Sequence, residues 1–187
     1  MPSREILRLD RHGQPQKWIT KNEAATYYAT DSVAWTLGDT FAALRGGLNS
    51  MTGQISRIEV HPIIAVRGVA KVNLFDACPA LTKRTLVARD RNTCGFCGGV
   101  FKYDDLTCDH IVPQSKGGLT KWENCICCCK KCNGAKADMS CEEANMPLLF
   151  APYRPSHAEH LILSGRNIRA DVHAFLAARL PKGSRLL

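Results

Sequence analysis

The amino-acid sequence predicts an α+β fold that includes a segment unusually rich in cysteine. Strand-like runs with alternating or β-branched residues occur in the first third of the chain, at 4–10, 32–37 and 55–66. Apolar residues at helical spacing occur at 81–90 and 167–180. Nine of the ten cysteines lie between positions 94 and 141. Together these observations favour strands and helices arranged around a Cys-rich centre.

The composition is that of an ordinary globular protein. The 187 residues include 45% apolar and 22% charged residues, which argues against collagen-like, disordered and fibrous classes. No apolar run approaches the ~18–20 residues needed to cross a bilayer. The N-terminal MPSREILRLDRHGQ carries charges where a signal peptide has its apolar stretch. We therefore expect a cytoplasmic protein without a membrane partner.

The charge balance indicates an anionic partner. Lys and Arg number 25 against 17 Asp and Glu, which gives a net charge of +8. Nucleic acid is the commonest partner of such a chain, although excess charge can also simply keep a protein soluble.

The N-terminal elements follow from local signals. Thr20 and Glu23 have the spacing of a capping box, which predicts a short helix after Thr20. Residues 41–54 (FAALRGGLNSMTGQ) are expected to form a short helix or loop. Pro62 should bend the strand-like run 55–66 or place it at a sheet edge.

The C-terminal elements are predicted in the same way. Ser140 and Glu143 suggest a second capping box, for a short helix ending near Pro147. Asn167 is the expected N-cap of the helix at 167–180, whose apolar stripe should pack in a core. We divide the chain into an N-terminal region (1–80), a central domain (81–147) and a C-terminal extension (148–187).

The cysteine spacing predicts a zinc site with four thiolate ligands. Cys94 and Cys97 form one Cys-x-x-Cys pair, and the second pair is either Cys125 with Cys128 or Cys129 with Cys132. Residues 123–128 read as a strand, on which thiols three apart point to opposite faces, whereas a turn entering a helix lets them converge. We therefore prefer Cys129 and Cys132, with Cys125 and Cys127 as small apolar residues on one face. The plainest interpretation is a structural zinc ribbon.

Residues between and beside these pairs carry a more specific pattern. Asp109-His110 comes first, then Asn124, then Cys129-x-x-Cys132-Asn133 and Lys136. This pattern resembles the HNH endonuclease family, in particular small bacterial and phage members. The resemblance implies a ββα-metal fold with strands near 107–113 and 123–128 and a helix starting around 130–133, wrapped around one catalytic divalent ion.

Each residue type suits phosphodiester hydrolysis. His110 is the expected general base, because a neutral imidazole accepts a proton from water at working pH. Asp109 and Asn133 offer the hard oxygens that Mg²⁺ or Mn²⁺ prefers. Asn124 can accept a hydrogen bond from the His110 ring and so select its tautomer. Since adjacent strand residues point apart, Asp109 and His110 must lie at a strand end or contact the phosphate from different sides.

Four lysines are candidate nucleic-acid contacts: Lys116, Lys130, Lys131 and Lys136. Lys136 lies one turn beyond Asn133 and is expected to reach a phosphate; the other three could equally form a solvated face. The sequence thus predicts a metal-dependent endonuclease acting on DNA, and a double-stranded substrate is expected. The alternatives are a zinc-stabilised DNA-binding module without catalysis and a zinc ribbon for protein interaction. A homodimer would suit cleavage of both strands, but the sequence carries no signature of one.

Overall fold

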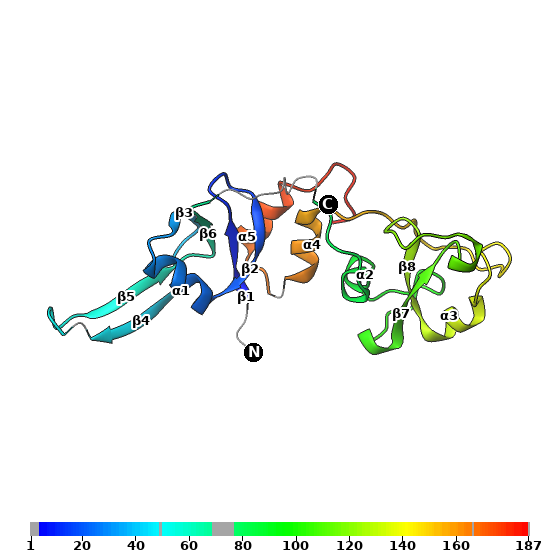
Figure 1. Ribbon diagram of the computed structural model, residues 1–187, viewed down its shortest axis with the longest axis horizontal. Coiled ribbons are helices and arrows are strands. Elements are labelled where there is room, and N and C mark those ends of the chain that lie inside the picture. The colour runs from blue at the N-terminus through cyan, green and yellow to red at the C-terminus, as the bar shows by residue number, and fades with distance from the viewer. Residues whose placement is uncertain (1–3, 49, 69–76, 166, 187) are drawn as a thin grey trace. The chain divides into compact units, whose positions relative to one another are not determined.

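The computed structural model describes residues 4–48, 50–68, 77–165 and 167–186. The chain divides into two units (Figure 1): unit 1 comprises residues 1–77 and 157–187, and unit 2 comprises residues 78–156. Part of the expected N-terminal region, residues 69–76, lies outside the described residues. The division of the chain into three parts, with boundaries at 80/81 and 147/148, stays a prediction.

A four-stranded mixed sheet forms the centre of unit 1, in the order β2-β1-β6-β3. β1 (Arg4–Leu9) pairs antiparallel with β2 (Pro15–Thr20) and parallel with β6 (Ile63–Val66), and β3 (Val33–Leu37) pairs antiparallel with β6. The strands expected at 4–10 and 32–37 are thereby confirmed. A sheet with apolar residues on both faces needs cover on both sides.

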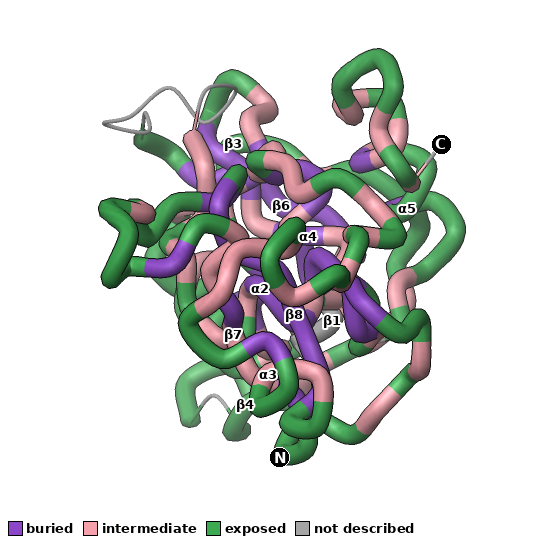
Figure 2. Tube along the Cα trace, turned by 90° about the vertical axis from the view of Figure 1, so that its right-hand side faces the viewer, coloured by how far each residue is buried: buried purple, intermediate pink, exposed green. Residues whose placement is uncertain are grey.

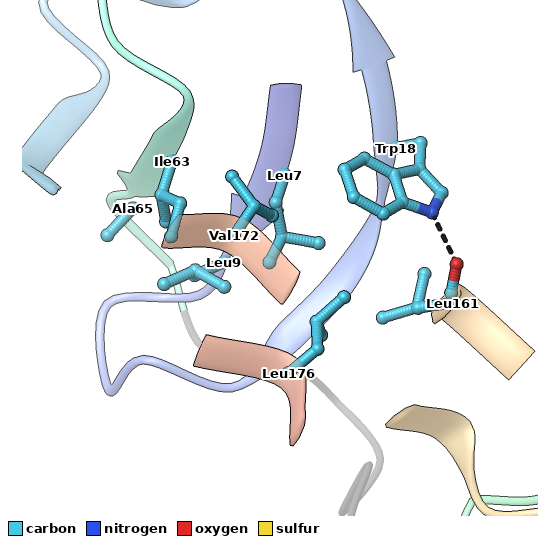
Figure 3. Close-up of a cluster of buried hydrophobic side chains, with 8 residues drawn as sticks. All are labelled: Leu7, Leu9, Trp18, Ile63, Ala65, Leu161, Val172 and Leu176. Atoms are coloured by element: carbon cyan, nitrogen blue, oxygen red, sulfur yellow. Dashed lines mark hydrogen bonds between the residues drawn. The ribbon is translucent and has the colours of Figure 1, made fainter. Parts of the chain in front are cut away.

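Two C-terminal helices cover one face of this sheet. α4 (His157–Ser164) and α5 (Ala170–Ala177) contribute Leu161, Val172 and Leu176 to a buried cluster (Figure 3). The sheet supplies the remaining members: Leu7, Leu9, Trp18, Ile63 and Ala65. The Trp18 indole N–H donates to the Leu161 carbonyl at 2.9 Å, which satisfies the only polar atom of a buried side chain. The predicted core role of the stripe on the last helix is confirmed.

The opposite face is covered by α1 (Lys21–Ala29) and by the base of a hairpin formed by β4 (Ala42–Leu48) and β5 (Ile55–Val60). The capping box predicted at Thr20 and Glu23 is present. The prediction of a helix or loop at 41–54 was wrong for β4. Its apolar residues alternate, so that Ala42 and Leu44 pack on the sheet while the next residues face outward.

Three boundaries differ from the predictions. The run 55–66 is interrupted before Pro62, so β5 and β6 belong to different sheets. α5 begins at Ala170, and Arg169 rather than Asn167 takes the N-cap position; Asn167 has a φ of 54°, outside helical geometry. The capping bonds of Ser140 and Glu143 form, but residues 141–145 make only a turn, because Asn145 adopts a φ of 50°.

Unit 2 is organised by an antiparallel hairpin followed directly by a helix. β7 (Leu106–His110) pairs with β8 (Cys125–Cys129), and α3 (Lys130–Lys136) begins where β8 ends. α2 (Lys83–Arg89) packs on one face of the hairpin. β8 is buried along its whole length (Figure 2), with alternate residues in two separate cores. The β-β-α order implied by the resemblance is confirmed.

A buried ion pair that the sequence reading missed ties unit 2 together. The Arg89 guanidinium donates to both carboxylate oxygens of Asp90 and to the carbonyls of Trp122, Cys125 and Tyr153. Asp90 in turn accepts from the Cys127 backbone N–H at 2.9 Å. Every partner is satisfied, which is the condition for a buried charge pair to be tolerated.

In the part of the chain that the structure describes, none of the helices has the length and apolar character of a membrane span.

Candidate functional site

Four thiols meet at the start of α3. The Sγ atoms of Cys94, Cys97, Cys129 and Cys132 all lie within 4.8 Å of one another. A tetrahedral zinc ion with Zn–S bonds of about 2.3 Å places its sulfurs roughly 3.8 Å apart, so this cluster is compatible with structural zinc. The preference for Cys129 and Cys132 over Cys125 and Cys128 is confirmed.

Local structure explains why these thiols converge. The first pair lies on a tight loop in which Gly98 adopts a φ of 72° and donates to the Cys94 carbonyl at 3.0 Å. Gly95 in this loop donates to the Cys127 carbonyl at 2.8 Å, and a side chain there would overlap Ile126. The second pair spans the N-cap and first turn of α3, where the Cys129 sulfur accepts from the Cys132 N–H at 3.4 Å. The loop is thereby held against the end of the hairpin.

Within the cluster the pKa of Cys94 is lowered, whereas the pKa values of Cys97 and Cys132 are raised. The pKa of Cys94 is about 7. Burial raises this pKa, but the backbone N–H groups of Cys97, Cys129 and Phe96 donate to the sulfur, and their lowering effect outweighs that of burial. By contrast, burial raises the pKa of Cys127 and of Cys128 to about 12, which keeps both as neutral thiols. Cys125 and Cys127 share one buried cluster with Leu86 and Val87, so their predicted role as small apolar residues is confirmed.

The second part of the site lies at the end of β7. The strand ends at His110, and Asp109 precedes it directly opposite Ile126 of β8. Asp109 therefore points to the hairpin face that packs against α3, whereas His110 points to the other face. The pair lies at the end of β7, and contact with a phosphate from different sides stays a prediction.

Asp109 faces a buried lysine. Its Oδ2 lies 3.0 Å from the Lys136 Nζ, an ion-pair distance, but makes no hydrogen bond of good geometry. The Asp109 residue is 7% exposed and Lys136 is fully buried, with its Nζ donating to the His110 carbonyl at 2.8 Å. Burial raises the pKa of Asp109 above its usual value, and the Lys136 ammonium opposes that rise. The expectation that Lys136 reaches a phosphate was wrong, because its charge is used inside the protein.

His110 is oriented by a threonine that the sequence reading missed. Its Nε2 lies 2.9 Å from the Thr120 hydroxyl, which also accepts from the Gln114 amide at 3.0 Å. The Nδ1 of His110 makes no hydrogen bond among the described residues. No spacing rule pointed to Thr120; it reaches His110 only because the loop 111–124 folds back.

Asn124 clamps that loop instead of contacting His110. Its Oδ1 accepts from the Val112 N–H at 2.9 Å, and its Nδ2 donates to the carbonyls of Val112 and Leu119. The predicted Asn124–His110 hydrogen bond was therefore wrong, because the amide is saturated by backbone groups. A side chain at Gly118 would overlap the Val112 carbonyl, so this glycine is required for the fold-back. Asn124 acts on His110 only through the loop that carries Thr120.

Asn133 lies on the α3 face that turns toward β7. It precedes Lys136 by three residues, hence on the same side of the helix, and Lys136 contacts β7 through Asp109 and His110. Asn133 is half-buried, and its side-chain amide has no hydrogen-bond partner among the described residues. The Asp109 carboxylate, which is paired with Lys136, and the Asn133 amide, which is unpaired among the described residues, offer the oxygen ligands that a hard divalent cation prefers.

The surface lysines differ in their availability. Lys130 and Lys131 are exposed in the first turn of α3. Lys116 pairs with Glu143, and this contact together with the Ser140 cap lowers the pKa of Glu143 to about 2. Of the four candidate phosphate contacts, Lys130 and Lys131 are the two whose charges are accessible.

Comparison with known proteins gives one result. Residues 94–138 match the family model of the HNH endonucleases. The match covers the thiol cluster, the β7–β8 hairpin and α3. No curated protein matches the chain.

Proposed function

We propose, from the HNH domain at residues 94–138, that the chain is a metal-dependent endonuclease that hydrolyses phosphodiester bonds in DNA. One observation carries the proposal: the Asp109 carboxylate faces α3, where the Asn133 side-chain amide has no hydrogen-bond partner among the described residues, and directly precedes His110, whose Nδ1 is free among the described residues. A structural zinc ribbon needs neither feature. The net charge of +8 suits an anionic substrate.

Asp109 and Asn133 would hold the catalytic Mg²⁺ or Mn²⁺. When bound, the ion neutralises charge on the scissile phosphate and on the leaving oxygen. Lys136 keeps the Asp109 carboxylate and the His110 backbone in register by contacting both. Lys136 is therefore a positioning residue in this mechanism and does not touch the substrate.

His110 takes the proton from the attacking water. With Nε2 engaged by Thr120, Nδ1 is the nitrogen left to face the substrate. The water oxygen attacks phosphorus, its proton passes to Nδ1, and the bond to the 3′ oxygen breaks. The leaving oxygen takes a proton from solvent, giving a 5′ phosphate and a 3′ hydroxyl.

DNA backbone contacts come from the exposed start of α3. Lys130 and Lys131 supply two accessible charges there, and Lys116 joins them only after it leaves Glu143. Such contacts hold the duplex without reading its sequence.

Plasmid relaxation tests the proposal. Purified protein with Mg²⁺ or Mn²⁺ should nick supercoiled DNA, and His110→Ala should lower the rate by about 10²–10⁴-fold. His173→Ala, which removes an exposed histidine of α5, is the matched control and should cut like the wild type. Zinc content and melting temperature should be the same for all three proteins. Equal cutting by His110→Ala would refute the site.

One observation favours the second candidate function, a zinc-stabilised DNA-binding module without catalysis. Asp109 already has a cationic neighbour in Lys136, so its charge is balanced without a divalent ion. On this alternative, the protein binds plasmid, branched and modified DNA but cuts none of them.

A further inference from the structure

The β4–β5 hairpin of unit 1 has an outer face that no core uses. Among the described residues, β4 and β5 pair with each other and with no further strand. Ala42, Leu44 and Ile58 on the inner face pack on the sheet and α1. The residues that alternate with them point away from that core. They include the pair Ala43 and Glu59 and, farther along the hairpin, Arg45, Leu48, Ile55 and Arg57; the last four are here called the outer face.

Two arginines stand directly opposite each other on the outer face. Arg45 and Arg57 are cross-strand partners in the ladder, and both are exposed. Among the described residues, neither guanidinium has an ion-pair partner. Like charges directly opposite each other destabilise a two-stranded ladder. An anion lying over both arginines would relieve this repulsion; Glu59, two residues from Arg57 on the same face, forms no ion pair with either arginine among the described residues.

An apolar pair lies next to the arginines on the same face. The register shifts between Arg45 and Leu48, so that Leu48 stands opposite Ile55. Since Ile55 and Arg57 are two residues apart, the two pairs share one face. Leu48 is 67% and Ile55 55% exposed, and Met51 beyond them is 94% exposed. Exposed apolar side chains beside paired arginines are typical of a binding surface.

We propose that the outer face binds duplex DNA, with Arg45 and Arg57 on phosphates and Leu48 and Ile55 against a groove. A two-stranded ribbon fits the major groove of B-DNA. A second copy of the chain is disfavoured as occupant, because it would bring the same arginine pair against this one. Unit 1 as a whole also contains more basic than acidic residues, with 14 Lys and Arg against 9 Asp and Glu. The inference rests on the proposed function only in taking DNA as the partner.

Salt-dependent binding tests the proposal without any cleavage. Fluorescence anisotropy of a labelled 20-base-pair duplex, without divalent ions, compares the full chain with Arg45→Gln/Arg57→Gln. Lys17→Gln/Lys182→Gln removes two exposed charges of unit 1 outside the hairpin and is the control. Loss of two phosphate contacts should lower the slope of log affinity against log salt by about 1.8. Between 50 and 200 mM salt, the wild-type affinity should then fall about 12-fold more than that of the arginine variant.

The outcomes separate this proposal from the nuclease. A reduced slope in the arginine variant, with the control unchanged, supports the hairpin contact whether or not the protein cuts DNA. An unchanged slope overturns it, even if the wild type is an active nuclease. The proposal is also overturned if the wild type and the control bind anionic vesicles, the arginine variant does not, and all three proteins bind DNA equally well. Leu48→Ser/Ile55→Ser should weaken DNA binding at every salt concentration without changing the slope. Because all four side chains are exposed, the variants should melt no lower than the wild type.

Discussion

The Lys136 ammonium lies 3.0 Å from the Asp109 carboxylate in a site where Lys136 is fully buried. This pair joins α3 to the end of β7. It thereby connects Asp109, the first residue of the proposed catalytic set, to the helix whose start carries two thiols of the cluster. A buried charge without its partner is costly, so each residue depends on the other.

Lys136→Met should destabilise unit 2 by about 3–5 kcal/mol, because it leaves the Asp109 carboxylate buried and uncompensated. Lys131→Met removes an exposed lysine of the same helix and should change stability by less than about 0.5 kcal/mol. Urea denaturation followed by tryptophan fluorescence measures both. Equal stability of the two variants would show that the pair contributes nothing.

The Arg89–Asp90 node should behave similarly. Arg89→Met removes donors to three carbonyls and leaves Asp90 unpaired, so we expect a loss of about 3–5 kcal/mol. Arg84→Met, at an exposed position of α2, is the control. A difference below about 1 kcal/mol between them in the same denaturation experiment would contradict this role.

Zinc ligation separates two sets of cysteines. Cys129→Ser should lose bound zinc and unfold the segment around α3, because structural zinc supplies about 10–16 kcal/mol of binding free energy. Cys125→Ala should keep one zinc per chain, since its thiol packs with Leu86 and Val87 rather than in the cluster. Atomic absorption on both purified variants gives the answer, and zinc loss from Cys125→Ala would reverse the assignment.

Thr120 should tune His110 without contacting DNA. Thr120→Val removes the hydroxyl beside Nε2 and should lower kcat by about 10–100-fold with little change in KM. The pH profile of kcat should also move, because the hydroxyl selects the tautomer of the base. Thr120→Ser restores the hydroxyl and should restore both. If Thr120→Val lowers the melting temperature but leaves kcat and its pH profile unchanged, Thr120 has a structural role only.

His157 gives unit 1 a pH dependence. Burial lowers its pKa below the usual 6.5, although its Nε2 lies 3.0 Å from the Gln16 carbonyl. The unfolded chain then binds the proton more tightly than the folded chain does. The contribution of neutral His157 to the free energy of unfolding is therefore complete above about pH 6.5, and it is lost as the pH falls toward the folded-state pKa. His157→Gln should flatten this slope in thermal melts, whereas His173→Gln should not. The reverse result would contradict the sign.

Patterns with a strict local rule were predictable from sequence. The capping box at Thr20, the apolar stripe of α5 and the choice of Cys129 and Cys132 each follow from geometry within a few residues. β4 was missed because its glycines suggested a loop, and only pairing with β5 makes that segment a strand. Pairing is a long-range property that local propensity does not contain.

The candidate site shows the same limit. The resemblance to the HNH endonucleases singled out Asp109, His110 and Asn133, but it did not give their hydrogen-bond partners. Asn124 contacts the loop backbone, and Thr120 takes the position beside His110 that Asn124 was expected to hold. Lys136 has the charge of a phosphate contact, yet its burial depends on how α3 packs on β7.

Chemical rescue tests the role of His110 most directly. His110→Gly removes the base and leaves space at the strand end, so added imidazole should restore metal-dependent plasmid nicking in a concentration-dependent way. Imidazole should leave Asp109→Ala inactive, because the group that this variant lacks is the proposed metal ligand and not the proposed base. Full nicking by His110→Gly without imidazole, at unchanged zinc content, would contradict the assignment of His110 as the general base.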